Sequence, residues 1–302
     1  MYKEDVDLPL ILVMLLIFFI SWVIFKSSLN GAELATQSPL LFKKPSESME
    51  RKKISTFLVL DVEGTCVPSI GFDWPNEIIE WPVVLLRWDE SSKSDGCQRL
   101  TIVDEFHSFV RPTFQPKLHP FCTELTGITQ EQVNSAPTFP EVLSSCKAFL
   151  IKNGVIDSEG NPLQTYIWCT EDGPWDLRDF FTKQAYISGI QRPSWIPYKI
   201  LDVRKTFGEW YTQRYLRRFT KNSRHNGSFS INHSYKLSKQ LELLNLTFEG
   251  REHSGIDDSR NIARVLIELS ARGEPLDAAN LDTRPIRKYS WMGPNGSITA
   301  NF

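Results

Sequence analysis

The stretch I-S-T-F-L-V-L-D-V-E-G-T, residues 54–65, decides which fold this sequence predicts. Residues 54–62 of this stretch are mostly apolar on both faces, which is typical of a strand in the middle of a sheet. Asp61 and Glu63 end the run, and side chains two residues apart on a strand point to the same face. We therefore expect two carboxylates side by side at the carboxyl end of a central strand. A hard cation such as Mg²⁺ or Mn²⁺ would relieve their repulsion, although a strand end running out into solvent has the same pattern.

Four more apolar runs predict strands, and periodic stretches between them predict helices. The strands are expected at 78–88, 102–110, 165–169 and 198–201. The helices are expected near 120–126 and 130–134, after Thr138, from Pro174, and up to about Ala271. Strands followed by strand–helix alternation favour an α/β fold with a mixed, mostly five-stranded sheet flanked by helices.

A second acidic group stands in the run H-S-G-I-D-D-S-R-N, residues 253–261. Asp258 continues the apolar stripe of the helix that follows, so it is expected to face inward. Asp257 is expected to face water and to cap the helix. A buried carboxylate needs compensation, which a metal ion would supply. His253, taken alone, is more often an ordinary surface histidine.

A third acidic group stands in the run E-D-G-P-W-D-L-R-D, residues 171–179. Asp172 lies where the following helix needs an N-cap. Asp176 falls in the first helical turn, from which it can reach the centre of the fold. Asp179 is expected to be solvated and to pair with Lys183 four residues later.

An uncharged block near the start of the chain predicts a membrane anchor. The run L-P-L-I-L-V-M-L-L-I-F-F-I-S-W-V-I-F, residues 8–25, would be roughly 27 Å long as a helix, close to the thickness of a bilayer core. We expect residues 1–26 to form a single hydrophobic helix, with a cleaved signal peptide or a buried core helix as the alternatives. More lysines follow the run than precede it, which predicts that the rest of the chain faces the cytosol. Without an anchor the protein would be cytoplasmic.

Composition divides the remainder into three parts. Residues 27–53 are rich in Ser, Pro and charge, which is typical of a flexible linker. Residues 54–273 are expected to form the folded domain. Gly273 and Pro275 supply a stop signal, so residues 274–302 are expected to be a weakly ordered tail.

The overall composition excludes several classes of protein. Hydrophobic residues make up 41% and charged residues 23%, which excludes a disordered or collagen-like chain. The 34 basic and 36 acidic residues give a net charge of −2, so any nucleic-acid surface must be local. The 5 cysteines include no C-x-x-C pair, which indicates free thiols rather than structural zinc or a disulfide framework.

One local region is strongly basic. Between 204 and 224 the chain carries seven basic residues and one acid, interleaved with aromatic residues. Basic side chains can neutralise phosphates, and aromatic rings can stack on unpaired bases. Alternatively, the aromatic residues form helix core and the charges a solvated face. The candidates for contact with nucleic acid are Arg214, Arg217, Arg218 and Lys221.

The motifs D-V-E-G-T, P-W-D-L and H-S-G-I-D-D-S-R-N-I-A-R together resemble the three exonuclease motifs of the DEDDh 3′–5′ exonucleases. The intervening E-I-I-E-W-P-V-V-L-L, F-V-R-P and F-C-T-E-L-T-G-I-T-Q-E-Q-V are similar to the enhanced-RNAi (Eri-type), three-prime histone-mRNA exonuclease subgroup. The similarity spans about residues 54–273. The connection at 220–234 is longer than is usual in that family.

The resemblance implies a ribonuclease-H-like fold and a two-metal hydrolysis of RNA from its 3′ end, releasing nucleoside 5′-monophosphates. It implies two Mg²⁺ ions, replaceable by Mn²⁺, with Asp61, Glu63, Asp176 and Asp258 as ligands and His253 as general base. The expected partner is single-stranded RNA or an RNA 3′ end. Two alternatives stay open: a DNA exonuclease with the same site, or a catalytically inactive, membrane-tethered nucleic-acid-binding module.

Overall fold

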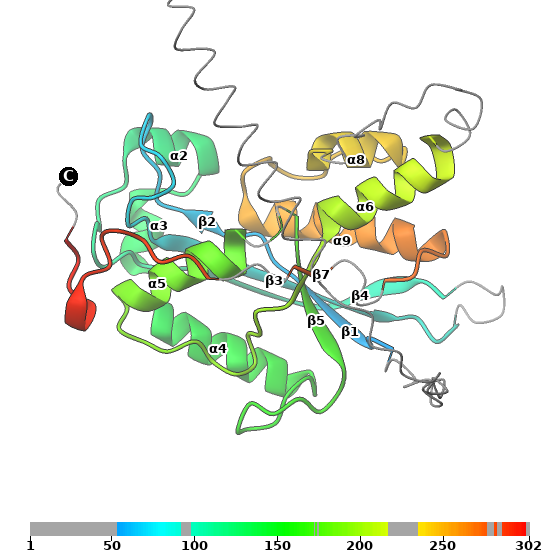
Figure 1. The fold of residues 1–302 in the computed structure, drawn as a ribbon, viewed down its shortest axis with the longest axis horizontal. Helices are drawn as coiled ribbons and strands as arrows, with labels where there is room; N and C mark the ends of the chain where they lie inside the picture. The colour runs from blue at the N-terminus through cyan, green and yellow to red at the C-terminus, as the bar shows by residue number, and fades with distance from the viewer. Residues whose placement is uncertain are drawn as a thin grey trace, which may run out of the picture. The chain divides into compact units, whose positions relative to one another are not determined.

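The chain divides into two units, Met1–Arg51 and Lys52–Phe302, and the fold described below belongs to the second. The computed structural model describes residues 53–91, 98–171, 173, 175–216, 235–276, 281–282 and 286–299 (Figure 1). Within these ranges, no helix is long and apolar enough to span a bilayer. Several predictions concern residues outside them, namely the membrane helix at 8–25, the linker up to residue 52, Asp172, Arg217, Arg218, Lys221 and the connection at 220–234.

A mixed sheet forms the centre of the unit. Its strands are β1 (Thr56–Val59), β2 (Glu63–Gly64), β3 (Ile78–Trp88), β4 (Leu100–Phe109), β5 (Tyr166–Thr170), β6 (Ile200–Asp202) and β7 (Leu281–Asp282). Their order is β2-β3-β1-β5-β6-β7, with β4 beside β3. Strand β1 pairs in parallel with β5 and antiparallel with β3. The mixed α/β sheet is as predicted, but the described residues give it 7 strands rather than five. The two additional strands, β2 and β7, have only 2 residues each, too few to produce an apolar run.

Helices cover both faces of this sheet. They are α2 (Pro120–Thr126), α3 (Gln130–Ser135), α4 (Phe139–Lys152), α5 (Phe181–Ile187), α6 (Val203–Tyr211), α8 (Leu237–Leu243) and α9 (Gly255–Ala271). Two π-helical turns, η2 (Trp175–Phe180) and η3 (Thr212–Leu216), and a short 3-10 turn, η5 (Pro294–Gly296), complete the elements. Figure 1 shows α4 and α5 on one side of the sheet and α6, α8 and α9 on the other.

Alternation along β1 explains how one strand serves two cores. Leu58 belongs to the cluster that contains Phe139 of α4 and Phe181 of α5. Phe57 and Val59 belong to the opposite cluster, with the buried residues of α6 and α9. All four residues of β1 are buried, so the apolar run of the sequence reads correctly as a central strand.

The strand predicted over 54–62 is interrupted before its acidic end. Strand β1 ends at Val59, and Glu63 already belongs to β2, which pairs with β3 at Glu80. Asp61 therefore lies in the connection 60–62 between the two strands, on neither of them, although β2 continues the register in which β1 pairs with β3. The pairing of β2 with β3 is a contact between separate segments, which the alternation of apolar and polar residues along one segment does not predict.

The C-terminal segment differs from the weakly ordered tail that was expected. Tyr289 and Trp291 are buried, and they pack with Tyr186 of α5 in a separate apolar cluster. The Tyr289 hydroxyl donates to Asp179 Oδ1 at 2.9 Å. The prediction that Asp179 is solvated and pairs with Lys183 is therefore wrong. Its carboxylate is fully buried and bound by Arg178 and Tyr289, because the C-terminal segment covers it.

Candidate active site

Three carboxylates from separate parts of the chain meet at one end of the sheet. Asp61 comes from the connection between β1 and β2, Glu63 from β2 and Asp258 from the first turn of α9. One oxygen from each lies within 4.8 Å of the others, which makes them the one group of this kind among the described residues that could hold a metal ion. The sequence predicted all three, and the structure brings them together. Carboxylate oxygens at this spacing are the ligands that hard divalent cations prefer.

Asp176 joins this group from the other side. It lies in η2 and is 5% exposed, and its Oδ1 accepts a hydrogen bond from the Val62 backbone N–H at 3.2 Å. Val62 stands between Asp61 and Glu63, so this hydrogen bond connects η2 to the segment between β1 and β2. Asp176 lies close enough to raise the pKa of Asp61. The structure thus places the fourth predicted carboxylate beside the other three.

The electrostatics of the cluster favour a bound cation. Burial, followed by repulsion from Asp176, Glu63 and Asp258, holds the pKa of Asp61 well above its usual range. Burial and the nearby acids, Glu80 first among them, do the same to the pKa of Glu63. Burial raises the pKa of Asp258 to about 7, even though a hydrogen bond from the His253 backbone opposes the shift. Carboxylates in this state are costly to ionise unless a positive charge lies between them.

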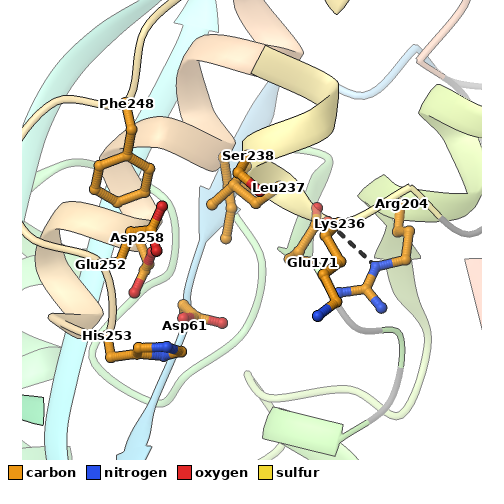
Figure 2. A pocket seen from close by; sticks show the side chains of 11 residues that line it. Asp61, Glu171, Arg204, Lys236, Leu237, Ser238, Phe248, Glu252, His253 and Asp258 are labelled. Carbon is orange, nitrogen blue, oxygen red and sulfur yellow. Dashed lines mark hydrogen bonds and ion pairs between the residues drawn. The ribbon is translucent and has the colours of Figure 1, made fainter. Parts of the chain in front are cut away.

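His253 lies on the exposed loop just before α9. Its φ of 63° is in the left-handed region, which is uncommon for a residue with a side chain but is adopted more readily by His, Asn and Asp. Its imidazole lines the same cavity as Asp61 and Asp258 (Figure 2). The imidazole is therefore open to solvent and lies on the cavity that Asp61 and Asp258 line.

The start of α9 is held in place by a residue that sequence reasoning missed. The Glu80 carboxylate in β3 is 2% exposed and accepts hydrogen bonds from the Gly255 N–H at 2.9 Å and the Ile256 N–H at 3.2 Å. It also contacts His107 Nε2 at 2.8 Å. A buried carboxylate at the amino end of a helix satisfies free N–H groups and complements the helix dipole. Glu80 therefore fixes the turn that carries Asp258.

The cavity beside the acids has a basic wall. It has a volume of about 500 Å³, and its lining includes Arg204 and Lys236 as well as the acids and His253. Figure 2 shows Asp61, Asp258 and His253 on one side and Lys236, Glu171 and Arg204 across from them. Arg204 Nε lies 3.2 Å from Glu171 Oε1. This ion pair holds the guanidinium at the wall.

Glu171 also lines the cavity, and the sequence analysis did not identify it as a site residue. It follows β5 directly, and β5 is the parallel neighbour of β1, so Glu171 and Asp61 both lie just beyond the carboxyl ends of adjacent strands. Glu171 contributes to the raised pKa of Asp61. Its position just after the strand predicted at 165–169 was the signal that could have identified it.

The basic residues predicted to contact nucleic acid are not brought together at the site as the acids are. Arg214 lies exposed on η3 and does not line the cavity. Two aromatic residues of the same region, Phe207 and Trp210, are buried in the core around α6. For these two, the alternative of helix core is confirmed. The described cations that do reach the cavity are Arg204, at the start of the basic region, and Lys236, beyond its end.

The sequence profile of the exonuclease family, RNase T type, matches residues 58–266, which include every acid and the histidine of this site. The chain belongs to this exonuclease family. Among its relatives, the exonuclease is 33% identical to the 3′-5′ exonuclease eri1 of Schizosaccharomyces pombe over 277 residues, covering 86% of this chain and 83% of that protein. It is 34% identical to the human 3′-5′ exoribonuclease 1, covering 71% of this chain and 52% of that protein.

Solved structures show the same relationship for the fold. The nuclease domain of 3′hExo, a DEDDh family member bound to rAMP, superposes with a TM-score of 0.61 and 30% identity, covering 77% of this chain and 98% of that one. A 3′-exonuclease that recognises the histone mRNA stem-loop gives a TM-score of 0.60 and 29% identity, covering 79% and 96%. These matches confirm the resemblance to Eri-type DEDDh exonucleases. The exonuclease spans about half the length of the mammalian relatives it matches.

Proposed function

We propose that this protein is a divalent-metal-dependent exoribonuclease that removes nucleotides from the 3′ end of RNA and releases nucleoside 5′-monophosphates. One observation carries the proposal: Asp61, Glu63 and Asp258 lie within 4.8 Å of one another, beside a cavity that His253 also lines. The relatives that bear the name 3′-5′ exoribonuclease support RNA as the substrate.

The residues present fit two Mg²⁺ ions, with Mn²⁺ as a substitute. Asp61, Glu63 and Asp258 would hold one ion, Asp61 would also contact the second, and Asp176 would bind directly or through water. The raised pKa values of Asp61 and Glu63 support this assignment, because a cation would offset both the burial and the mutual repulsion that raise them. Such ions supply a more acidic water and stabilise charge on the attacking and leaving oxygens of the phosphate.

His253 is the general base in this proposal. Its imidazole is exposed and stands at the rim of the acidic cluster, where it can accept the proton of the attacking water. Imidazole is the side chain that enzymes use most often to accept a proton from a reacting group. Glu80 holds the following turn, so the imidazole and Asp258 keep their relative positions.

The cavity wall supports a nucleic-acid strand, with its chain of phosphodiesters, as the substrate. Lys236 and Arg204 stand across from the acids, where they can contact the phosphates upstream of the scissile bond. Phe248 lines the same cavity and offers an aromatic ring to a base. These groups do not distinguish ribose from deoxyribose, so a DNA exonuclease is the second candidate and rests on the same site.

The membrane anchor also stays a proposal. The uncharged run at 8–25 and the excess of lysine after it support a single membrane helix with the catalytic unit in the cytosol. Asn226, Asn232, Asn245 and Asn295 lie in N-x-S/T sequons, which are modified only in the lumen. Expression with a glycosidase assay should find none of them glycosylated; a glycan at any of them contradicts the cytosolic orientation.

One assay separates these functions. The purified chain is incubated with 3′-labelled single-stranded RNA and with the matching DNA, with Mg²⁺ or with EDTA. We expect release of labelled 5′-monophosphate from RNA in Mg²⁺ and none in EDTA. Faster release from DNA would favour the second candidate. Binding of both strands without release would instead favour an inactive nucleic-acid-binding module.

A further inference from the structure

Two cysteines lie side by side near the acidic cluster. Cys66 lies two residues beyond the end of β2, and Cys122 lies in α2. Cys66 packs against the apolar cluster that contains Cys122. The two thiols are close enough for donation from Cys66 to Cys122 to raise the pKa of Cys66 and lower that of Cys122. The Cys122 thiol in turn donates to the Gly64 carbonyl oxygen, with the sulfur 3.7 Å away. The chain thus brings two sulfurs together, 56 residues apart, next to the strand that carries Glu63.

The other described cysteines lack this arrangement. Cys146 is a buried residue of α4, and Cys169 is buried in the core on the opposite face of the sheet. Cys122 is buried as well, but Cys66 is partly exposed and is the one cysteine of the described residues that a small oxidant can approach from solvent. Accessible cysteines with a second thiol in reach are the ones that oxidation converts to disulfides.

We propose that Cys66 and Cys122 are an oxidisable pair that a hydroperoxide closes into a disulfide, tying α2 to the loop beyond β2 and lowering turnover. The Cys66 thiol loses its proton and the resulting thiolate attacks the O–O bond of the hydroperoxide. A sulfenic acid forms on Cys66 and, from hydrogen peroxide, the departing hydroxide takes up that proton as one water. The Cys122 sulfur then attacks the Cys66 sulfur, so that the S–S bond forms and the S–O bond breaks. Hydroxide leaves with the Cys122 proton as a second water. The two sulfurs are oxidised by two electrons in all, and the peroxide is reduced.

The disulfide would act on the site through the backbone of residues 64–66. The two sulfurs must approach from hydrogen-bonding distance to about 2.05 Å, so either the loop or the first part of α2 moves. The Gly64 carbonyl also loses the thiol donor that it has in the reduced protein. Glu63 precedes Gly64 directly, and displacement of a metal ligand by about 1 Å costs roughly 100-fold in rate. This consequence rests on the proposed nuclease function, whereas formation of the disulfide does not.

Mass spectrometry tests the crosslink independently of activity. The full chain, reduced and then treated with hydrogen peroxide, is alkylated and digested with trypsin without reductant. Trypsin leaves Cys66 in the peptide 54–87, and Cys122 together with Cys146 in the peptide 118–147. A Cys146→Ser variant therefore assigns the linkage. We expect the two peptides linked in both proteins and released by dithiothreitol. Absence of the linked pair, with Cys66 oxidised to sulfinic acid or left free, would overturn the proposal.

Turnover before and after oxidation tests the consequence. Hydrogen peroxide should lower the RNA-degrading rate of the wild type by at least roughly tenfold, and dithiothreitol should restore it. In Cys66→Ser and Cys122→Ser the ratio of oxidised to reduced rate should stay near one, and Cys146→Ser should behave as the wild type. An equal loss in Cys66→Ser would overturn the control of turnover by this pair. If the reduced protein shows no nuclease activity, the crosslink still decides whether the disulfide forms.

Discussion

The backbone of Gly255 packs directly on the backbone of Asp61. A Cβ atom on Gly255 would lie 2.6 Å from the Asp61 carbonyl oxygen and 3.1 Å from Glu80 Oε2. The Gly255 N–H donates to that same Glu80 oxygen at 2.9 Å. The first residue of α9 therefore packs against the connection that carries Asp61, and Asp258 follows within the same turn.

Gly255→Ala should push α9 away from the connection between β1 and β2 that carries Asp61. The clash is with backbone, which cannot rotate away, so we expect a loss of about 1–3 kcal/mol in the free energy of unfolding and a fall in turnover. Chemical denaturation and the rate on labelled RNA measure the two effects. Gly71 is a matched control, because a Cβ there meets nothing within 4 Å. A Gly255→Ala variant as stable and active as Gly71→Ala would contradict the packing described here.

His253→Asn should remove the base while keeping the backbone. Asparagine tolerates the left-handed conformation that His253 adopts at φ 63°, so the loop and α9 should keep their positions. Loss of a general base lowers turnover by roughly 10²- to 10⁴-fold. The metal-induced rise in melting temperature should stay unchanged, since the carboxylates are intact. A variant that keeps wild-type turnover would exclude His253 as the base.

The stability gained from a divalent metal should depend on pH. Burial raises the pKa of Asp258 to about 7, so between about pH 4 and pH 7 the metal-free folded state binds more protons than the unfolded state. Its stability from this group therefore falls as pH rises through that window. Asp61 and Glu63 act in the same direction, since their pKa values are also raised.

A metal ion competes with these protons, so Mg²⁺ should raise the melting temperature more at about pH 8 than at about pH 5.5. Thermal unfolding with Mg²⁺ and with EDTA at both pH values measures the difference. At a concentration 100 times the dissociation constant, the expected stabilisation is about 2.7 kcal/mol. An equal metal effect at both pH values would mean that the carboxylates are already ionised without the metal.

The local sequence pattern predicts a site residue correctly when a single helix or strand determines which way its side chain points. Asp258 follows the apolar stripe of α9, and it is buried as that stripe requires. Asp61 and Glu63 were expected together, and they are together. The predicted strand is interrupted at residues 60–62, but Glu63 pairs with Glu80 in the same register in which β1 pairs with β3, so the spacing of two residues keeps the acids together.

What the sequence could not predict depends on contacts between distant residues. Glu80 and Gly255 are 175 residues apart, and nothing near Glu80 indicates that it accepts hydrogen bonds from the start of α9. Asp179 was expected to be solvated because a lysine stands four residues later. Its burial follows from Tyr289, 110 residues away, in a segment whose composition predicts little order.

The adjacent aspartates at the start of α9 allow the most direct test of the account. Asp258 is buried in the acidic cluster, whereas the Asp257 side chain is 23% exposed and pairs with Arg260 at 3.2 Å. Both are changed to Asn, and Mg²⁺-dependent release of labelled 5′-monophosphate from the 3′ end of single-stranded RNA is measured. Asp258→Asn should lose more than the roughly 10- to 100-fold that an outer-shell change costs, and Asp257→Asn should stay close to wild type. Equal rates for Asp258→Asn and Asp257→Asn would contradict the account.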